Sequence, residues 1–365
     1  MTMDAVGATA PNAGTPDTAT PHAGTWATDA AATAAPVIGT VTADAFLAAH
    51  GFAGAAREPL PGDAGRRRYT RLRGGPAPAL LMDCSAEPEV DLHPFLRMQA
   101  PLAEAGLSVP RILARDEGAG LLLVEELGER THADLLDAGA APVPLYAAAG
   151  EALAALHAVP PPPGLPAWDG AAMARAAAGT FLDWWWPAAL GGPPTAAQRE
   201  AFARAVRDTI APFGGTRGLV HRDYFPANLT LVPGREGVRA VGILDFQDAA
   251  LGHPAYDLLS LVEDARRDVA PEARAAAIAA YRRVRDVPDL EAAMAAHGAV
   301  RHLRVASLWV RLARRDGKPR YLDHGTRCWR LLAASLAHPA ARPLASFLDA
   351  HVPLASRMNP PLEGP

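Results

Sequence analysis

Four polar residues in the second half of the chain, at a fixed spacing, constrain its fold more than any other feature. The segment "LVHRDYFPANLTLV" (219–232) carries His221, Asp223 and Asn228, and the segment "AVGILDF" (240–246) carries Asp245. Each segment contains a short apolar run that is typical of a β-strand. Carboxylate and amide oxygens at the ends of adjacent strands converge, so the pattern predicts a polar site built on two short strands.

The N-terminal third of the chain divides into two parts. Residues 1–40 are rich in Ala, Thr, Pro and Gly with few large apolar side chains, so we expect them to be disordered. A capped helix is expected from Thr42 to Gly51. Residues 57–127 then predict two hairpins, one strand between them ("APALLMDC") and one helix ("DLHPFLRMQAPLAEAGL"). This part of the chain is predicted to be a small antiparallel sheet with one helix against it.

From Thr131 onward the pattern is mostly helical, interrupted by the two short strands "NLTLV" and "AVGILDF". The predicted fold class is therefore α+β, with a small antiparallel β N-lobe and a larger, mostly helical C-lobe. We expect the N-lobe to cover residues 41–127 and the C-lobe residues 128–365. A ligand is expected in the cleft between two such lobes.

Composition narrows the function. Net charge is −4 and no basic run with interleaved aromatic residues occurs, so nucleic-acid binding is not expected. The two cysteines, Cys84 and Cys328, form no metal or redox motif. No apolar run is long enough to span a bilayer, and no signal peptide is recognisable. We expect a cytoplasmic enzyme, monomeric, with a small-molecule substrate and no membrane partner.

The polar site fits phosphoryl transfer, which needs a carboxylate to position and deprotonate the attacking hydroxyl, and metal ions that bridge the phosphates. Asp223, in a loop ahead of a strand, suits the first role. Asn228 and Asp245 offer the hard oxygen ligands that Mg²⁺ prefers. Each of these residues alone is a weak signal, since a strand-end Asp is usually a turn residue, but their joint spacing predicts a phosphotransferase site.

The stretches "HRDYFPAN" and "LDFQDAALGHPAYDL" resemble the aminoglycoside phosphotransferase/choline kinase-like superfamily, which shares the protein-kinase fold. The resemblance implies that Asp223 is the catalytic base, that Asn228 and Asp245 bind Mg²⁺, and that ATP is the phosphate donor. It also implies that Asp257 supports the catalytic loop, and His221 is expected to support it too.

A narrower resemblance rests on "GDAGRRRYTRL", "LLMDC", "LDFQDA" and "RDGKPRYL", which are similar to one branch of that superfamily. Its members are the anomeric sugar kinases that act on N-acetylmuramate and N-acetylglucosamine. They place phosphate on the C1 hydroxyl in cell-wall recycling. The resemblance covers roughly residues 42–335 and implies an amino-sugar acceptor for this chain.

The strand "APALLMDC" (77–84) lies where other kinases carry the lysine that grips ATP, yet it offers Met82 and Asp83 instead. The chain has a single lysine, Lys318, far along the C-lobe. Arginine binds phosphate bidentately, so the hairpin before this strand is the expected replacement. The nucleotide-binding residues predicted from the hairpin and from the linker after the sheet are Gly62, Gly65, Arg66, Arg68, Glu125 and Leu127. Alternation along a strand would place Arg66 and Arg68 on the cleft face together.

Acceptor-site candidates come from two stretches of the C-lobe. "FLDWWWP" (181–187) offers Asp183 and Trp185, with a buried-core reading of the tryptophans equally open. "VEDARRDV" (262–269) offers Glu263 and Arg266, which could equally be the polar face of a helix. The arginines of the helix "RHLRVASLWVRLARRDGKPR" (301–320) are expected to form a solvated face. A carboxylated acceptor could recruit one of them, but the sequence does not select which.

Two alternative functions remain open. An aminoglycoside or other small-alcohol phosphotransferase would share the same catalytic residues. Aminoglycosides are polycations, however, and the acceptor stretches mix acids with Arg266 and Arg267. A catalytically inactive nucleotide-binding pseudokinase would explain the missing lysine, but such a protein is also expected to lose the base or a metal ligand.

Overall fold

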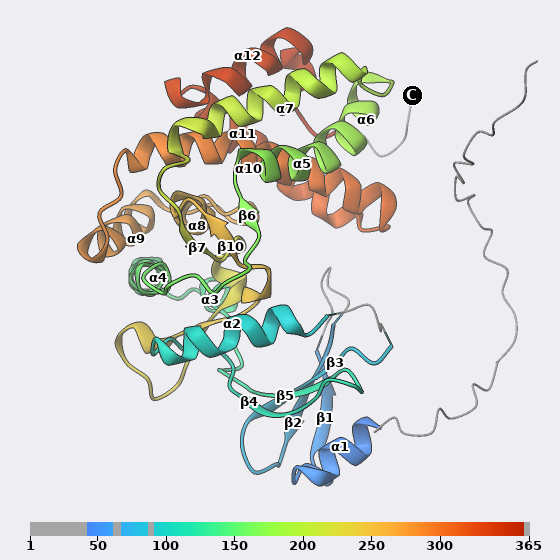
Figure 1. The fold of residues 1–365 in the computed structure, drawn as a ribbon, viewed down its shortest axis with the longest axis vertical. Coiled ribbons are helices and arrows are strands. Elements are labelled where there is room, and N and C mark those ends of the chain that lie inside the picture. Colours follow the sequence, from blue (N-terminus) through green and yellow to red (C-terminus); the bar gives the residue numbers. More distant parts are fainter. Residues whose placement is uncertain (1–41, 61–66, 87–90, 361–365) are drawn as a thin grey trace, which may run out of the picture. The chain divides into compact units, whose positions relative to one another are not determined.

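The computed structural model describes residues 42–60, 67–86 and 91–360. Its N-terminal part is a five-stranded antiparallel sheet with strand order β1-β2-β3-β5-β4 (Figure 1). The strands are β1 (Ala56–Pro59), β2 (Arg68–Arg73), β3 (Ala79–Asp83), β4 (Ile112–Asp116) and β5 (Leu121–Glu125). The predicted disordered segment 1–40 lies outside the described residues.

The two faces of this sheet are covered differently, because side chains alternate along each strand. The outer face carries Leu72, Leu81 and Leu123 and packs against Phe46 and Leu47 of helix α1 (Ala43–Ala49). The inner face packs against helix α2 (His93–Glu104) and the rest of the molecule through the side chains of Met82, Leu122 and Val124. Any ligand between the sheet and the helical part meets the inner face.

The remainder is largely helical, as Figure 1 shows. Its helices are α3 (His132–Asp137), α4 (Pro142–Leu156), α5 (Gly170–Thr180), α6 (Trp186–Leu190), α7 (Ala196–Ile210), α8 (Ala255–Val262), α9 (Pro271–Val284), α10 (Leu290–Arg315), α11 (Gly325–Leu336) and α12 (Arg342–His351). Five short strands interrupt them: β6 (Ala167–Trp168), β7 (Gly218–Val220), β8 (Leu229–Leu231), β9 (Val241–Ile243) and β10 (Ala250–Gly252).

Close packing holds the helices together. Gly150 of α4 lies so near α9 that an added Cβ would stand 2.3 Å from the Ala277 carbonyl oxygen. Helix α10 runs through the centre of the helical part with a buried stripe that includes Leu303, Ala306 and Val310, as its sequence predicts. That stripe belongs to a core shared with α5, α7, α11 and α12.

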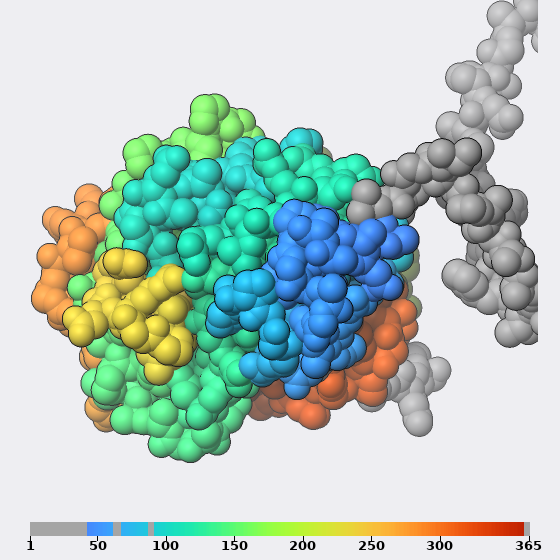
Figure 2. Space-filling view, turned by 90° about the horizontal axis from the view of Figure 1, so that it is seen from below, coloured from blue at the N-terminus to red at the C-terminus, as the bar shows by residue number. Residues whose placement is uncertain are grey.

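The β8–β9 connection reaches back to the sheet. In Figure 2 this segment, coloured yellow, lies on the surface beside the residues of the N-terminal part. Arg235 donates from Nη2 to Glu125 Oε1 (2.6 Å) and from Nη1 to Ser108 Oγ (2.8 Å). The Ile243 amide donates to the Ser108 carbonyl oxygen (2.8 Å). These bonds join the end of the sheet to the strands that carry the predicted site.

The predicted fold class is confirmed: a small antiparallel sheet with its helices precedes a larger helical part. The two short strands predicted around Asn228 and Asp245 are β8 and β9, paired antiparallel with Leu229 opposite Ile243. The three-stranded sheet β6-β10-β7 was not predicted, because its strands have two or three residues each. In the described part of the chain, no helix is both long and apolar enough to cross a membrane.

Candidate active site

The loop that follows β7 is held by one buried carboxylate. Asp257, at the start of α8, is fully buried and accepts hydrogen bonds from the backbone amides of His221 (2.6 Å) and Arg222 (2.8 Å). His157, directly after α4, lies 3.0 Å from the same carboxylate through Nε2. A buried charge is tolerated only when it is hydrogen-bonded. Asp257 therefore determines the path of the backbone just before Asp223.

His221 connects this loop to the end of β9. Its Nε2 lies 2.8 Å from the Leu244 carbonyl oxygen, which can only accept, so this nitrogen carries the proton. Nδ1 is then an acceptor and receives the Asp223 amide at 3.3 Å. The buried imidazole thus links the residue before Asp245 to the backbone of Asp223.

Asn228 and Asp245 come together because β8 and β9 are neighbours. The Leu244 amide donates to the Asn228 carbonyl oxygen (2.9 Å), and Asn228 Nδ2 donates to the Asp223 carbonyl oxygen (2.8 Å). Since the amide nitrogen points to Asp223, Oδ1 points the other way. Asp245 is exposed, and Gln247 Nε2 donates to its Oδ1 (2.5 Å). Two oxygen-bearing side chains therefore lie at the ends of adjacent strands, next to the loop that carries Asp223.

Two residues of the site have backbone conformations that side chains disfavour. Arg222 has φ 78° and Asp245 has φ 60°, both in the left-handed region that favours glycine. Arg222 is held by its bonds to Asp257 and to the Asp248 carbonyl oxygen (3.0 Å), and by stacking 4.1 Å above the Trp168 ring. Strain of this kind persists only where surrounding contacts determine it, and it is concentrated at functional sites.

Asn228 and Asp245 offer fewer protein oxygens than a metal site formed by protein alone requires. Within the described residues, no group of three or more His, Cys, Asp and Glu could hold a metal alone. Mg²⁺ bound with a nucleotide, however, takes one or two protein oxygens and fills its remaining positions with phosphates and water. Asn228 Oδ1 and the Asp245 carboxylate have the chemistry and placement of such a pair.

The phosphate-binding prediction from the first hairpin needs one correction. Gly62, Gly65 and Arg66 lie outside the described residues. Arg68 pairs across the strands with Asp83 (Nη2 to Oδ2, 3.3 Å) and shares the outer face with Leu72. Its side chain therefore points away from the helical part, contrary to the prediction. Side chains alternate along the strand, so residue 67 shares the inner face with Tyr69, and residue 68 shares the outer face with Leu72.

Arg67 and Tyr69 occupy the inner face instead. Tyr69 pairs with Met82 of β3 and packs against the inner-face core. Burial raises the pKa of Tyr69 to about 12, with Asp245 adding to the rise and Arg67 opposing it. The electrostatic environment of Tyr69 therefore includes one charge from the sheet and one from the end of β9.

The lysine position of β3 is filled by apolar packing. Met82 is fully buried on the inner face, and Asp83 is on the outer face, where its Oδ1 accepts from the Ser85 amide (2.8 Å). The neighbouring inner-face cation, Arg71, is already bound to Glu126 and lies 3.7 Å from Glu58. Neither β3 residue can replace the lysine that other kinases use.

The linker after the sheet is held by side-chain and backbone bonds. The Glu125 carboxylate binds Arg111 (2.9 Å) and Arg235 (2.6 Å), so its side chain is already engaged. Leu127 is buried, and its carbonyl oxygen lies 3.4 Å from Thr230 Oγ1. Gly128 follows with φ 132°, and an added Cβ would stand 2.6 Å from the Leu231 carbonyl oxygen. The linker thus packs tightly on β8.

The tryptophan prediction for the acceptor site is wrong for Trp185. This ring is fully buried, stacks on Phe181 and donates from Nε1 to the Met358 carbonyl oxygen (2.8 Å). It belongs to the helical core, because the segment Phe181–Trp185 is a π-helical turn whose apolar side faces α10. Asp183 lies on the exposed side and pairs with Arg199 of α7 (2.8 Å).

The other two acceptor candidates lie in the loop after α8. The Arg266 guanidinium stacks 4.7 Å above the ring of Phe225, two residues beyond Asp223, and 5.5 Å from Trp309. Glu263 accepts from His302 (2.9 Å) and Arg274 (3.2 Å). Burial opposes its ionisation, but the bonds from His302 and Arg274 outweigh burial and lower the pKa of Glu263.

Several residues of the site escaped sequence reasoning. His157 binds Asp257, Trp168 lies under Arg222, and Arg304 of α10 lies near Asp223. No recognisable sequence motif links any of these residues to the Asp223 loop. Arg304 belongs to the helix whose arginines were expected to face solvent. The sequence predicted only that one arginine of this helix could bind a carboxylated acceptor, without selecting which.

Comparison with known proteins agrees with this geometry. Residues 56–297 match the Phosphotransferase enzyme family. The chain is 36% identical over 359 residues to an N-acetylmuramate/N-acetylglucosamine kinase of Caulobacter vibrioides, covering 86% of this chain and 96% of the relative. It is also 36% identical over 293 residues to a kinase of the same description from Pseudomonas aeruginosa, covering 76% and 83%.

A solved structure of a choline/ethanolamine kinase family protein from Mesorhizobium loti matches with a TM-score of 0.58 and 18% identity, covering 84% of this chain and 97% of that one. At this identity the likeness concerns the fold alone. The family match covers the sheet, the Asp223 loop and the β8–β9 strands together. On these grounds the chain belongs to the Phosphotransferase enzyme family.

Proposed function

We propose that this chain is an ATP-dependent kinase that phosphorylates the anomeric C1 hydroxyl of N-acetylmuramate or N-acetylglucosamine, a reaction of cell-wall recycling. In this proposal residues 41–127 form the nucleotide-binding lobe and residues 128–365 the lobe that holds the acceptor. The observation that carries it is the bonded arrangement of Asp223, Asn228 and Asp245. The names of relatives at 36% identity supply the acceptor class.

Asp223 is the proposed base, which orients the C1 hydroxyl and takes its proton as the hydroxyl oxygen attacks the γ-phosphorus. The bond between the γ-phosphorus and the β–γ bridging oxygen breaks, and that oxygen leaves with ADP. Its carboxylate must be presented at a defined place, since misplacement by about 1 Å costs much of the rate. Asp257 and His221 support this role by holding the backbone on both sides of residue 222.

Asn228 and Asp245 are the proposed Mg²⁺ ligands. These two side chains would hold the ion, which would supply positive charge against the negative charge that develops on the transferred phosphate. Asn228 supports this role because its Nδ2 is engaged by the Asp223 carbonyl oxygen, which turns Oδ1 outward. Gln247 orients Asp245 in the same way from the other side.

The nucleotide is proposed to lie under the inner face of the sheet, with its adenine at the linker Glu125–Leu127. Gly62 and Gly65 would allow the first hairpin to approach the phosphates closely. Arg66, from the same hairpin, and Arg67, which has inner-face parity, are the proposed replacements for the absent lysine. Arg68 is left out because of its ion pair with Asp83 on the outer face.

The charges around Asp223 favour a sugar that is neutral or anionic over a polycation. Arg222 precedes Asp223, and Arg266 lies over Phe225. Arg304 lies near the Asp223 carboxylate. Three cations beside the proposed base disfavour an aminoglycoside, whose amino groups require carboxylates. Glu263 and Asp183 are proposed to touch the acceptor only at its edge, since both are already paired with arginines.

The test is ³¹P NMR of the purified protein with Mg·ATP and, in separate tubes, N-acetylmuramate, N-acetylglucosamine or kanamycin. A sugar-1-phosphate doublet with formation of ADP is the expected result. Phosphate on kanamycin alone would replace the proposal with an aminoglycoside phosphotransferase. Bound nucleotide without product in any tube would support an inactive pseudokinase.

A further inference from the structure

Arg304 is a cation of α10 that lies near the Asp223 loop. Its Nη2 lies 3.4 Å from the Tyr256 hydroxyl, and its backbone carbonyl accepts from Thr180 Oγ1 (3.1 Å), which anchors this turn of the helix. The Tyr256 ring packs edge-on against Trp168 (5.6 Å between centroids), and Trp168 lies under Arg222, the residue before Asp223. The Tyr256 hydroxyl and, to a smaller extent, the Asp223 carboxylate raise the pKa of Arg304, while burial opposes them.

Arg304 has no ion-pair partner among the described residues, and the hydrogen bond of its side chain there goes to the Tyr256 hydroxyl. Its side chain is only partly buried. A half-buried guanidinium without a directly bonded carboxylate is suited to bind an anionic group of another molecule.

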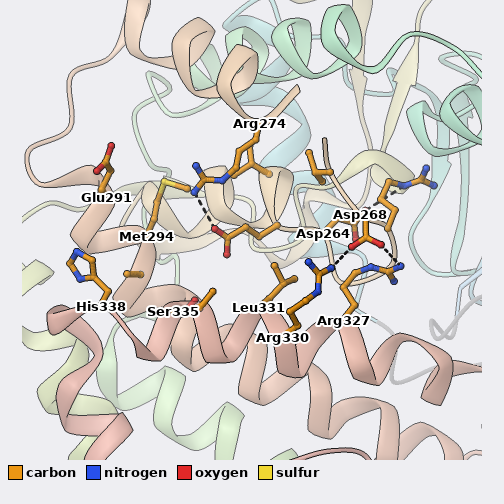
Figure 3. A pocket seen from close by; sticks show the side chains of 16 residues that line it. Asp264, Asp268, Arg274, Glu291, Met294, Arg327, Arg330, Leu331, Ser335 and His338 are labelled. Carbon is orange, nitrogen blue, oxygen red and sulfur yellow. Dashed lines mark hydrogen bonds and ion pairs between the residues drawn. The ribbon is translucent and has the colours of Figure 1, made fainter. Parts of the chain in front are cut away.

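The arginines of the nearby cavity provide a contrast. Figure 3 shows a cavity of about 500 Å³ lined by residues of the loop after α8 and by α9, α10 and α11. In it Asp268 lies between Arg327 (3.1 Å) and Arg330, and Arg274 is paired with Glu263. Because these cations already have carboxylate partners, the cavity does not call for an anion. Arg304 does.

We propose that Arg304 binds the carboxylate of the acceptor sugar, the lactyl group on O3 of N-acetylmuramate, while the C1 hydroxyl of the same ring faces Asp223. The inference rests on the proposed function and adds a specificity-determining residue to it. Tyr256 holds the guanidinium on one side through Nη2. Its remaining N–H groups form a fork that matches a carboxylate. N-acetylglucosamine, which lacks the lactyl group, would leave these donors unmet.

The experiment compares kcat/KM for three acceptors: N-acetylmuramate, its lactyl methyl ester, and N-acetylglucosamine. A hydrogen bond between charged groups contributes a factor of about 10- to 100-fold. The wild-type protein is expected to favour the acid over its methyl ester by this factor. In Arg304→Gln the preference should fall to near unity, and in Arg304→Lys, which keeps the charge, it should remain in part.

The control variant is Arg330→Gln, which removes a cavity arginine that is paired with Asp268 and should keep the wild-type preference. Equal losses on all three acceptors in Arg304→Gln would overturn the inference, because they would mean that Arg304 acts on Asp223 or on the fold. A wild-type enzyme that does not distinguish acid from ester would overturn it without any variant. Absence of transfer to every acceptor would instead remove the proposed function itself.

Discussion

The Asp223 loop and the inner face of the sheet both border the proposed nucleotide site, but they are built in different ways. The loop is held through its backbone by buried groups: Asp257 accepts from two of its amides, and His221 accepts from the Asp223 amide while its Nε2 binds the Leu244 carbonyl oxygen. The inner face instead presents side chains from one strand, Arg67 and Tyr69, opposite the apolar Met82. The backbone geometry is therefore fixed by buried bonds at the proposed base, whereas at the proposed phosphate site it is the side chains of a single strand that would make the contacts.

The largest effect is expected from removing the proposed base. Asp223→Ala should lower kcat by about 10³-fold or more, because the loss of a general base with its positioning role is of that order. Nucleotide affinity should change little, since the phosphates are bound elsewhere. Steady-state kinetics and calorimetric titration with Mg·ATP measure the two effects, with the exposed Asp286→Ala as the control. Turnover within tenfold of wild type would refute the base assignment.

Asp257→Ala should break the loop itself. The substitution leaves the His221 and Arg222 amides and His157 without their acceptor, and loss of a buried charged partner costs about 3–5 kcal/mol. We expect a lower free energy of unfolding in urea and a loss of kcat in the residual folded protein. Asp183→Ala, which removes an exposed pair with Arg199, should change stability by less than about 1 kcal/mol. Equal effects from the two variants would contradict the contrast between buried and exposed acids.

Acid should destabilise the helical part that supports the loop. Burial lowers the pKa of His253 to about 3 and of His297 to about 4, and their rings stack 5.0 Å apart. The unfolded chain binds protons at these histidines below about pH 6.5 while the folded chain does not, so stability present above that pH is lost as pH falls toward 4. One such histidine contributes about 2 kcal/mol of the loss at pH 5.

Urea unfolding at pH 7.5 and pH 5.0 measures this loss. His297→Gln removes one titrating group, so its stability should fall less between the two pH values than that of the wild type. An identical fall in both proteins would show that His297 does not stay neutral in the folded state.

The smallest effect on catalysis is expected from substitutions in the sheet, where the neighbouring residues Arg67 and Arg68 lie on opposite faces. Arg67→Gln should raise KM for ATP by about tenfold, the value of one hydrogen bond to a charged group, with little change in kcat. Arg68→Gln, on the outer face, should change KM for ATP by less than about twofold, since it removes only an exposed ion pair. A larger rise in KM for ATP in Arg68→Gln than in Arg67→Gln would instead support the original prediction that Arg68 faces the nucleotide.

Sequence reasoning worked best where the interacting residues are close in the chain. Asn228 lies five residues after Asp223 and directly before β8, so the spacing already predicted that the two residues belong to one polar site. The bond between Asn228 Nδ2 and the Asp223 carbonyl oxygen is added by the structure. It failed at Trp185, because a tryptophan next to an acidic residue is equally compatible with a surface that binds a sugar ring and with a buried core position. It failed at Arg68 by one position, which in a strand exchanges the two faces.

The sequence by itself determined the residue types and spacing of Asp223, Asn228 and Asp245 and the order of sheet and helices, because these depend on local spacing and on hydrophobic period. Only the tertiary structure decided which arginine of β2 shares the inner face of the sheet and which cation of α10 packs near the Asp223 loop. Arg304 contacts Tyr256 through the packing of α10 against α8, and no spacing in the chain encodes that approach. The reason is physical: side-chain burial and electrostatic partners are properties of distances that form only when separate elements pack.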